Sequence, residues 1–279
     1  MERRRFGRTR REVAAIGQGT WQIGARDRDT AIAALRAGLD GGMNHIDTAE
    51  MYGDAEEIVG EAIAGRRDEV FLVSKVLPEN ASRAGTRAAC EASLARLRTD
   101  RLDGYLLHWR GEHPLEDTIA AFEDLEREGK IRSWGVSNFD TTDLEDLAKL
   151  HSARGPACNQ VLYHLRERAI EHAVIPWCEK HGVAVVGYSP FGHGDFPPPR
   201  SVGGRVLKRI ADAHGATPRQ VALRFLVRRP SLFAIPKAST SEHADENRGA
   251  GAFHLTEAEL AEIDVAFPRG PRRRSLPTL

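Results

Sequence analysis

The chain has 279 residues, with 40 lysine and arginine side chains and 40 aspartate and glutamate side chains, so its formal net charge is zero. This balance provides no long-range field toward nucleic acid or an acidic membrane surface, and we expect neither partner. The apolar fraction of 41% is enough for a large core, and one barrel of alternating strands and helices fills this length.

The expected elements begin with a hairpin or an irregular lid in residues 2 to 13, which contain Gly7-Arg8-Thr9. The first barrel strand, Val13 to Ile16, runs into Gly17-Gln18-Gly19-Thr20-Trp21. After it, apolar runs and helical spacing alternate. Strands are expected at 45–46, 70–75, 102–109, 131–137, 157–162, 183–188 and 232–235, and helices at 30–39, 56–64, 88–97, 115–128, 141–151, 170–181, 203–214, 218–228 and 242–250.

This order of elements predicts a closed parallel barrel. Eight strand exits alternate with helices, and no composition break marks a linker, which favours an α/β fold of the (β/α)8 TIM barrel type over an open doubly wound sheet. We expect a single domain over residues 1–279. A capping box at Thr256 predicts an additional C-terminal helix over 256–263, and the tail after Pro268 is expected to be irregular.

Nothing in the sequence indicates a disulfide framework or a metal site. Cys90, Cys158 and Cys178 are widely spaced, and His108 and His113 lack a carboxylate or cysteine partner at ligand spacing. The N-terminus is charged where a signal peptide needs an apolar core, and no apolar run approaches the roughly 18 residues of a membrane span. We expect a cytoplasmic monomer without a metal or a membrane segment.

Polar side chains stand at the exits of consecutive expected strands. Asp47, Lys75 and His108 follow the second, third and fourth strands, and Tyr52 lies in the loop after Asp47. Because functional groups of a parallel barrel gather at the C-terminal ends of its strands, we expect these four side chains in one pocket. Singly, Lys75 and Asp47 could form a plain ion pair and His108 could be a core histidine; together they favour a catalytic site.

The four groups suit the reduction of a carbonyl. A buried lysine lowers the pKa of a neighbouring phenol from its reference of about 10, and an aspartate keeps the lysine charged. Tyr52 could then protonate a carbonyl oxygen that His108 polarises through a hydrogen bond. The hydride must come from a nicotinamide or flavin cofactor, because no side chain supplies one. Lys75 could instead form a Schiff base in aldolase chemistry, although Asp47 would hold it charged.

The cofactor site is not expected to be of the Rossmann type, because no G-x-G-x-x-G follows a strand. Polar and aromatic residues at the exits of the later strands could hold the cofactor differently, through amide hydrogen bonds, an aromatic face for stacking and a cation for a phosphate. These residues are Ser137, Asn138, Gln160, Tyr188 and Lys237.

A set of short segments carries a family resemblance. They are Gly17 to Trp21, Asp47 to Gly53, Val73 to Lys75, Leu106 to Trp109, Trp134 to Asn138, Asn159-Gln160, Tyr188 to Pro190, Ile235 to Lys237 and Glu246-Asn247. Through them the chain resembles the aldo-keto reductases over nearly its full length. The resemblance implies a barrel, a catalytic tetrad of Asp47, Tyr52, Lys75 and His108, and NADPH, with NADH possible, extended across the barrel mouth.

The resemblance also implies individual contacts. Ser137, Asn138 and Gln160 would bind the carboxamide, Tyr188 would stack on the nicotinamide, and Trp21 and Trp109 would line the pocket for a small aldehyde or ketone substrate. Lys237, Ser239, His243, Glu246 and Asn247 would surround the adenosine, and Thr20, Ser189 and Phe191 complete the cofactor set. Members of this family can also retain the cofactor as sensors, so a nicotinamide-sensing binding module is an alternative function.

Three positions depart from the family pattern: Arg110 stands where proline is common, Phe191 where leucine is common, and His243 where arginine is common. The sequence of several segments, among them Trp177-Cys178-Glu179, is similar to that of small bacterial enzymes that reduce 2-oxoaldehydes such as methylglyoxal. Because little chain follows residue 268, we expect an open pocket that accepts a range of small aldehydes.

Overall fold

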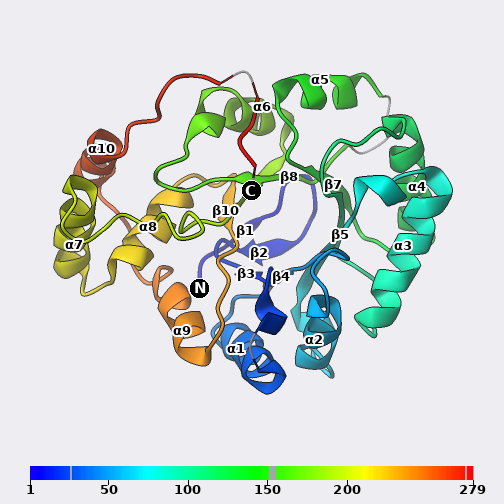
Figure 1. Cartoon of the computed structure of the whole chain (residues 1–279), viewed down its shortest axis with the longest axis horizontal. Coiled ribbons are helices and arrows are strands. Elements are labelled where there is room, and N and C mark those ends of the chain that lie inside the picture. The colour runs from blue at the N-terminus through cyan, green and yellow to red at the C-terminus, as the bar shows by residue number, and fades with distance from the viewer. Residues whose placement is uncertain (26, 151–154, 274, 279) are drawn as a thin grey trace.

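Figure 1 shows the computed structural model, which describes residues 1–25, 27–150, 155–273 and 275–278, as a ring of helices around a central barrel. The barrel strands are β3 (Gln18–Gly19), β4 (His45–Asp47), β5 (Phe71–Val76), β6 (Gly104–Leu107), β7 (Trp134–Ser137), β8 (Cys158–Leu162), β9 (Ala184–Tyr188) and β10 (Leu232–Ala234). They pair in parallel in chain order. Bridges from Ile16 to Ala234 and from Gly19 to Lys237 close the barrel, so the predicted (β/α)8 fold is confirmed.

The helices surround the barrel and follow most of the expected positions. They are α1 (Arg28–Asp40), α2 (Ala55–Ala62), α3 (Arg83–Arg96), α4 (Leu115–Arg127), α5 (Thr141–Lys149), α6 (Val174–His181), α7 (Val202–His214), α8 (Pro218–Leu226), α9 (Ser241–Gly249) and α10 (Glu257–Ala266), with short 3₁₀ turns η1 (Ile23–Ala25), η2 (Arg67–Glu69), η3 (Pro78–Asn80) and η4 (Ala169–His172). The helix expected over 170–181 is therefore two elements, η4 and α6. Residue 151, expected at the end of α5, lies outside the described residues.

Side-chain caps account for several of these helix starts. Thr256 accepts a hydrogen bond from the Glu259 backbone, and the Glu259 side chain accepts one in return from the Thr256 backbone, so the predicted capping box at α10 is confirmed. Thr217 and Gln220 form the same reciprocal pair at the start of α8, where Pro218 occupies the first helical position. These caps define where α8 begins, and α8 borders the functional cavity.

The position of the first barrel strand was predicted wrongly. Glu12–Ala14 (β2) pairs antiparallel with Arg3–Arg5 (β1), so the N-terminal hairpin is confirmed but takes up residues that were assigned to the barrel. The first barrel strand is β3, further along the chain. Phe6, between the two hairpin strands, packs its ring 4.7 Å from Phe71 and 5.0 Å from Phe233. Because Phe71 begins β5, the hairpin covers the amino-terminal end of the barrel and leaves the carboxyl-terminal end to the site.

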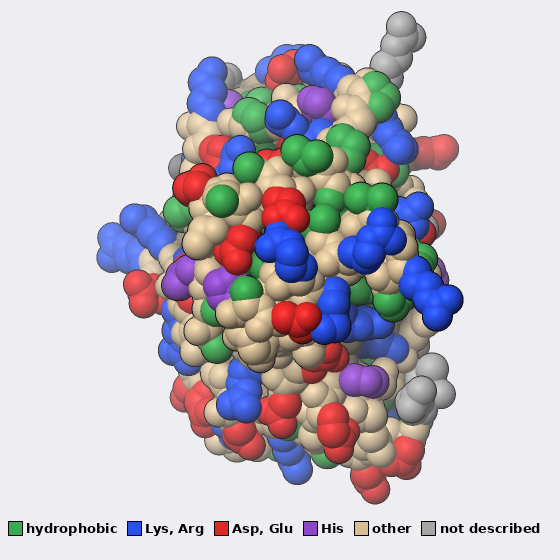
Figure 2. Space-filling model, turned by 90° about the vertical axis from the view of Figure 1, so that its left-hand side faces the viewer, with side chains coloured by type: hydrophobic (Ala, Val, Ile, Leu, Met, Phe, Trp, Pro, Cys, Tyr) green, Lys and Arg blue, Asp and Glu red, His purple; other side chains and the backbone are tan. Residues whose placement is uncertain are grey.

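The outer surface carries intermixed charges. Figure 2 shows the side of the molecule with α7 and α10, where basic and acidic side chains alternate without a large region of one sign. Ion pairs account for part of this pattern, because Arg209 of α7 pairs with Glu262 of α10, and Lys208 pairs with Asp212 within α7. Within the described residues, no helix is both long and apolar enough to cross a membrane.

His45 lies inside the barrel and should make the fold sensitive to acid. It is fully buried, its ring is 5.6 Å from the rings of both Phe6 and Phe71, and burial lowers its pKa from 6.5 to about 4. The unfolded chain therefore binds a proton below pH 6.5 that the folded protein takes up only near pH 4. Stability contributed by neutral His45 is complete above pH 6.5 and is lost as the pH falls toward 4.

We expect this single group to reduce the free energy of unfolding by about 2 kcal/mol between about pH 7 and pH 5. Urea unfolding of the wild type and of His45→Gln at both pH values measures it, because glutamine does not titrate. His108 also has a lowered pKa and acts in the same direction, so the variant should lose only part of the dependence. An identical pH dependence in both proteins would show that His45 does not cause it.

Candidate active site

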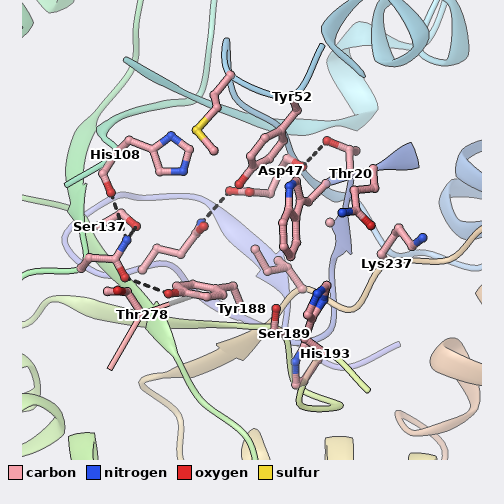
Figure 3. A pocket seen from close by; sticks show the side chains of 18 of the residues that line it. Thr20, Asp47, Tyr52, His108, Ser137, Tyr188, Ser189, His193, Lys237 and Thr278 are labelled. Atoms are coloured by element: carbon pink, nitrogen blue, oxygen red, sulfur yellow. Dashed lines mark hydrogen bonds between the residues drawn. The ribbon is translucent and has the colours of Figure 1, made fainter. Parts of the chain in front are cut away.

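A cavity of about 650 Å³ opens at the carboxyl ends of the barrel strands. The alternation of side chains along the strands decides which residues reach it. Phe71 and Val73 of β5 belong to the apolar cluster inside the barrel, so Lys75, two positions on, points to the same interior. Asp47 ends β4 on the same face as His45. The apolar layers thus form a floor beneath the polar groups. Figure 3 shows side chains that line the cavity, Asp47, Tyr52 and His108 among them.

Lys75 and Asp47 form a buried ion pair at this floor. The distance from Lys75 Nζ to Asp47 Oδ1 is 2.5 Å, and Lys75 also donates to the Thr48 carbonyl at 2.8 Å. Their side chains are 0% and 1% exposed. Burial lowers the pKa of Lys75, but the charge of Asp47 and the Tyr52 phenol raise it, and the net pKa lies above its ordinary value. Lys75 is therefore a charged ammonium group at neutral pH.

Two further hydrogen bonds hold Asp47 in position. Gln160 Nε2 of β8 donates to Asp47 Oδ2 at 2.7 Å, and Thr20 Oγ1 donates to the Asp47 carbonyl at 2.9 Å (Figure 3). Both Asp47 carboxylate oxygens thus have partners, from opposite sides of the barrel. The carboxylate can orient Lys75 but has little freedom to move.

Tyr52 lies over Lys75 from the loop after β4. Lys75 Nζ is 5.1 Å from the centre of the Tyr52 ring, and the ring meets His108 edge to face at 5.7 Å between centroids. Burial raises the pKa of Tyr52, and the Lys75 charge offsets this only in part. The expectation that Lys75 brings the pKa of Tyr52 below its ordinary value is therefore wrong. The phenol keeps its proton at neutral pH, as a proton donor must.

His108 follows β6 and lines the cavity beside Tyr52. Its side chain is buried, and this burial, followed by the charge of Lys75, lowers its pKa from 6.5 to about 3. A neutral imidazole has one N–H donor and one acceptor nitrogen. His108 can therefore donate a hydrogen bond to an oxygen in the cavity without carrying charge. The structure brings all four predicted tetrad residues together.

The residues expected to hold the nicotinamide end lie on the wall formed by β7, β8 and β9, next to the exit of β6 that carries His108. Ser137, Asn138, Gln160 and Tyr188 all line the cavity. The Tyr188 hydroxyl donates to Asn138 Oδ1 at 3.0 Å, and Asn138 Nδ2 donates to the His108 carbonyl at 3.1 Å (Figure 3). This wall therefore offers one aromatic ring with several amide donors and acceptors beside it.

Backbone strain concentrates around the cavity. Among the described residues, five that are not glycine have positive φ, and four of them line the cavity: Gln22, Asn138, Ser189 and His193. A side chain at positive φ is costly, and such residues cluster at functional sites where the surrounding structure holds them in place. The site thus stands apart from the rest of the fold in its backbone geometry as well as in its side chains.

The other predicted cofactor contacts fall into two groups. Lys237 and Phe191 line the cavity, as do Thr20 and Ser189. The cavity lining does not include Ser239, His243, Glu246 or Asn247. Ser239 precedes α9, and the other three lie on it. Glu246 Oε1 accepts a hydrogen bond from the Thr217 hydroxyl at 2.9 Å, which ties α9 to the start of α8. This second group therefore lies beside the cavity, next to the first turn of α8.

Arg219 is a cavity residue that the sequence reasoning missed. It lies in the first turn of α8, and its guanidinium carbon is 4.8 Å from the ring centre of Phe191 and 5.1 Å from that of Phe196. Two aromatic rings thus hold a cation at the positive end of a helix dipole. The signal in the sequence was the basic residue directly after the capping Thr217-Pro218, but its distance from every strand exit concealed it.

The substrate side of the cavity has apolar walls. Trp21 and Trp109 line it as predicted, and Met51, which is 48% exposed, and Arg110 lie with them. His193 stacks on Trp21 with 4.9 Å between ring centroids. Neither Met51 nor His193 was predicted, because no strand exit or motif marks a loop residue that folds back over the cavity.

The C-terminal tail reaches the cavity, which the sequence did not predict. Thr278 lines the cavity, and Figure 1 shows the C-terminal end over the centre of the barrel. The His172 ring contacts the Gly270 carbonyl at 2.9 Å, and Arg273 pairs with Glu167 at 2.9 Å, so the tail is anchored to the segment around η4. Within the described ranges, no group of three or more histidine, cysteine or acidic side chains is placed to hold a metal ion.

Comparisons with known proteins agree with this geometry. The pattern of the Aldo/keto reductase family matches residues 15–266. The chain is 47% identical over 260 residues to methylglyoxal reductase YeaE of Escherichia coli (strain K12), covering 92% of each chain. It is 33% identical to glyoxal reductase of Bacillus subtilis (strain 168), covering 91% of this chain and 89% of that protein. An aldo-keto reductase of Klebsiella pneumoniae solved in complex with NADPH superposes with a TM-score of 0.93 at 45% identity, covering 100% of both chains.

Proposed function

The chain belongs to the aldo/keto reductase family, and from this premise we propose that it uses NADPH to reduce small aldehydes, 2-oxoaldehydes among them, to alcohols. The observation that carries the proposal is the tetrad at the cavity floor, where a buried ion pair lies beneath a protonated phenol and a neutral imidazole. The similarity to enzymes named methylglyoxal reductase and glyoxal reductase supports the substrate class.

The residues of the cavity fit a nicotinamide dinucleotide. Tyr188 provides the aromatic face, and Ser137, Asn138 and Gln160 provide hydrogen bonds for a carboxamide. Lys237 and Arg219 provide positive charge for phosphates. When bound, the cofactor supplies the hydride that no side chain can supply. The neighbouring Ser239, His243, Glu246 and Asn247 would contact the adenosine from α9 and the loop before it.

The tetrad then has separate tasks. His108 donates a hydrogen bond that orients the substrate carbonyl and draws electron density toward its oxygen. Tyr52 gives its hydroxyl proton to that oxygen as the carbonyl carbon is reduced. Charged Lys75 stabilises the tyrosinate that remains, and Asp47 keeps Lys75 charged and in place. Trp21, Trp109 and Met51 would limit the substrate to small or flat groups.

The two alternative functions meet specific objections. Schiff-base formation needs a neutral amine, whereas Asp47 raises the pKa of Lys75 and holds its ammonium group at 2.5 Å. A sensor without a substrate would have no need for a complete tetrad beside the cofactor wall.

We further propose that residues 1–279 act as one domain and that the protein is a monomer. Sedimentation equilibrium tests the monomeric state.

Loss of NADPH absorbance with a panel of carbonyl compounds tests the proposed function. Methylglyoxal, glyceraldehyde and benzaldehyde should be reduced faster than bulky ketones of steroid size. Binding of NADPH without turnover of any of these compounds would favour the sensor. Borohydride trapping of a substrate on Lys75 would favour the aldolase.

Lys237 and Arg219 should differ in their effects on cofactor choice. Lys237→Ala should weaken NADPH binding by about tenfold and NADH binding much less, if Lys237 pairs with the 2′-phosphate that only NADPH carries. Arg219→Ala should weaken both cofactors by a similar factor, because both contain the pyrophosphate. Titration of protein fluorescence with each cofactor measures the two affinities.

Arg127 offers a matched control for these two variants. It lies on α4, its side chain is 74% exposed, and it pairs with Asp124 away from the cavity. Arg127→Ala should change neither affinity. An unchanged ratio of NADPH to NADH affinity in Lys237→Ala would remove Lys237 from the phosphate site.

A further inference from the structure

Arg110 is a cation at the cavity that the proposed reaction does not use. It comes after His108 and Trp109 in the segment that follows β6, and it lines the cavity together with Tyr52 and His108. Its side chain is 38% exposed, so the guanidinium is open to a ligand in water. An arginine has five N–H donors in a planar fork, which matches the two oxygens of a carboxylate.

The contacts of Arg110 within the protein leave donors for a ligand. Its nearest ion pair joins Nη1 to Asp143 Oδ1 at 3.6 Å, which is longer than a hydrogen bond. Asp143 is fixed by its role in the capping box of α5, where its Oδ2 accepts from the Asp140 backbone at 3.3 Å. Asp146, whose pKa is lowered by Lys149 and also by the charge of Arg110, pairs with Lys149 at 2.9 Å. Asp143 can thus orient the guanidinium and still leave its N–H donors available to a ligand.

The distribution of charge around the cavity decides what Arg110 is suited to bind. The lining contains the charged residues Asp47, Arg110, Arg219 and Lys237. Asp47 is balanced by Lys75, and Arg219 and Lys237 lie on the α8 and β10 side, where the proposed function places the cofactor phosphates. Arg110 is therefore the charged group that the described lining presents on the substrate side, beside His108 and Trp109.

We propose that Arg110 binds a carboxylate of the substrate, and that the preferred substrates are short aldehydes carrying a carboxylate group. This inference rests on the proposed aldehyde reduction and specifies its substrate class. Arg110 is two positions after His108, so their Cα atoms are at most about 7 Å apart, and a short chain of carbons can join a carbonyl at His108 to a carboxylate at Arg110. The apolar walls of Trp21 and Trp109 contact the connecting carbons.

Matched pairs of substrates test the inference. The pairs are 4-oxobutanoate with butanal and 4-formylbenzoate with benzaldehyde, each assayed with NADPH. The wild type should favour the carboxylate member of each pair by about tenfold in kcat/KM, the lower end for a charge-assisted hydrogen bond because Arg110 is partly exposed. Arg110→Met, which keeps an unbranched apolar stem but removes the guanidinium, should remove this preference and leave the neutral aldehydes within about threefold.

Three further measurements separate carboxylate binding from a structural role. The loss in Arg110→Met should appear in KM more than in kcat, because the carboxylate is bound equally in the ground state and the transition state. Arg110→Lys should restore part of the preference as a point charge without the fork. High salt should weaken the wild-type preference and leave the variant unchanged.

The outcomes distinguish this inference from the proposed function. Reduction of neutral aldehydes with no carboxylate preference in the wild type, or with the same preference in Arg110→Met, overturns the inference and leaves the proposed function standing. Failure to reduce any aldehyde of either kind overturns both.

Discussion

Replacement of Tyr52 by phenylalanine is expected to lower kcat by about 10²-fold or more, the usual cost of losing an acid catalyst, while NADPH binds as before. The variant removes only the hydroxyl. The ring that meets His108 edge to face and covers Lys75 remains, so packing should be kept. The phenol is the proton donor in the proposed reaction because burial raises its pKa and keeps it protonated at neutral pH.

Single-turnover kinetics with bound NADPH measure this effect on the chemical step, and fluorescence titration checks cofactor binding. Tyr105→Phe is a matched control, since Tyr105 is a buried tyrosine on β6 that packs against Phe122 and does not line the cavity. It should leave kcat within about threefold. A Tyr52→Phe enzyme as active as this control would show that another group donates the proton.

Lys75→Met is expected to reduce the free energy of unfolding by about 3 to 5 kcal/mol, in addition to abolishing most activity. The variant leaves Asp47 as a buried carboxylate that has lost its cation, although Gln160 still donates to one carboxylate oxygen. Removing one member of a buried ion pair costs more than removing both, because the remaining charge is left uncompensated.

The double variant Asp47→Asn/Lys75→Met tests this explanation. If the cost arises from the isolated charge, the double variant should be more stable than Lys75→Met alone in urea unfolding. Stabilities that simply add would mean that the two side chains are not coupled. Any residual activity of Lys75→Met should have its basic pH limit shifted upward, because Lys75 is the group that lowers the pKa of Tyr52.

The barrel and its tetrad could be predicted because both depend on local patterns. Apolar runs of strand length alternate with helical spacing, and the residue at the end of each run must lie at the same end of a parallel barrel. Asp47, Lys75 and His108 occupy such positions: Asp47 and His108 line one cavity, and Lys75 is buried against Asp47 beneath it. The capping box at Thr256 is equally local, since all its contacts lie within one turn.

Errors arose where the pairing of a backbone segment, or the burial of a side chain, depends on other segments of the chain. Val13 pairs with Arg4 in the hairpin, and the strand β3 that replaces it in the barrel has only two residues, too few for a periodic pattern. The pKa of Tyr52 was misjudged for a related reason. Its proximity to Lys75 could be inferred from strand order, but the extent of its burial depends on every segment that covers it.

The sequence by itself determined the parallel barrel, the end of it that carries the site, and the identity of the four side chains that meet there, because strand periodicity and residue type are local properties. Only the tertiary structure decided which loop residues enter the cavity. Arg219 lies on α8 and Thr278 in the C-terminal tail, and both reach the cavity. Arg110 departs from the family pattern in the sequence, but only the structure shows that it lines the cavity together with His108. The physical reason is that packing between segments far apart in the chain sets these positions, and no local pattern encodes the distance between them.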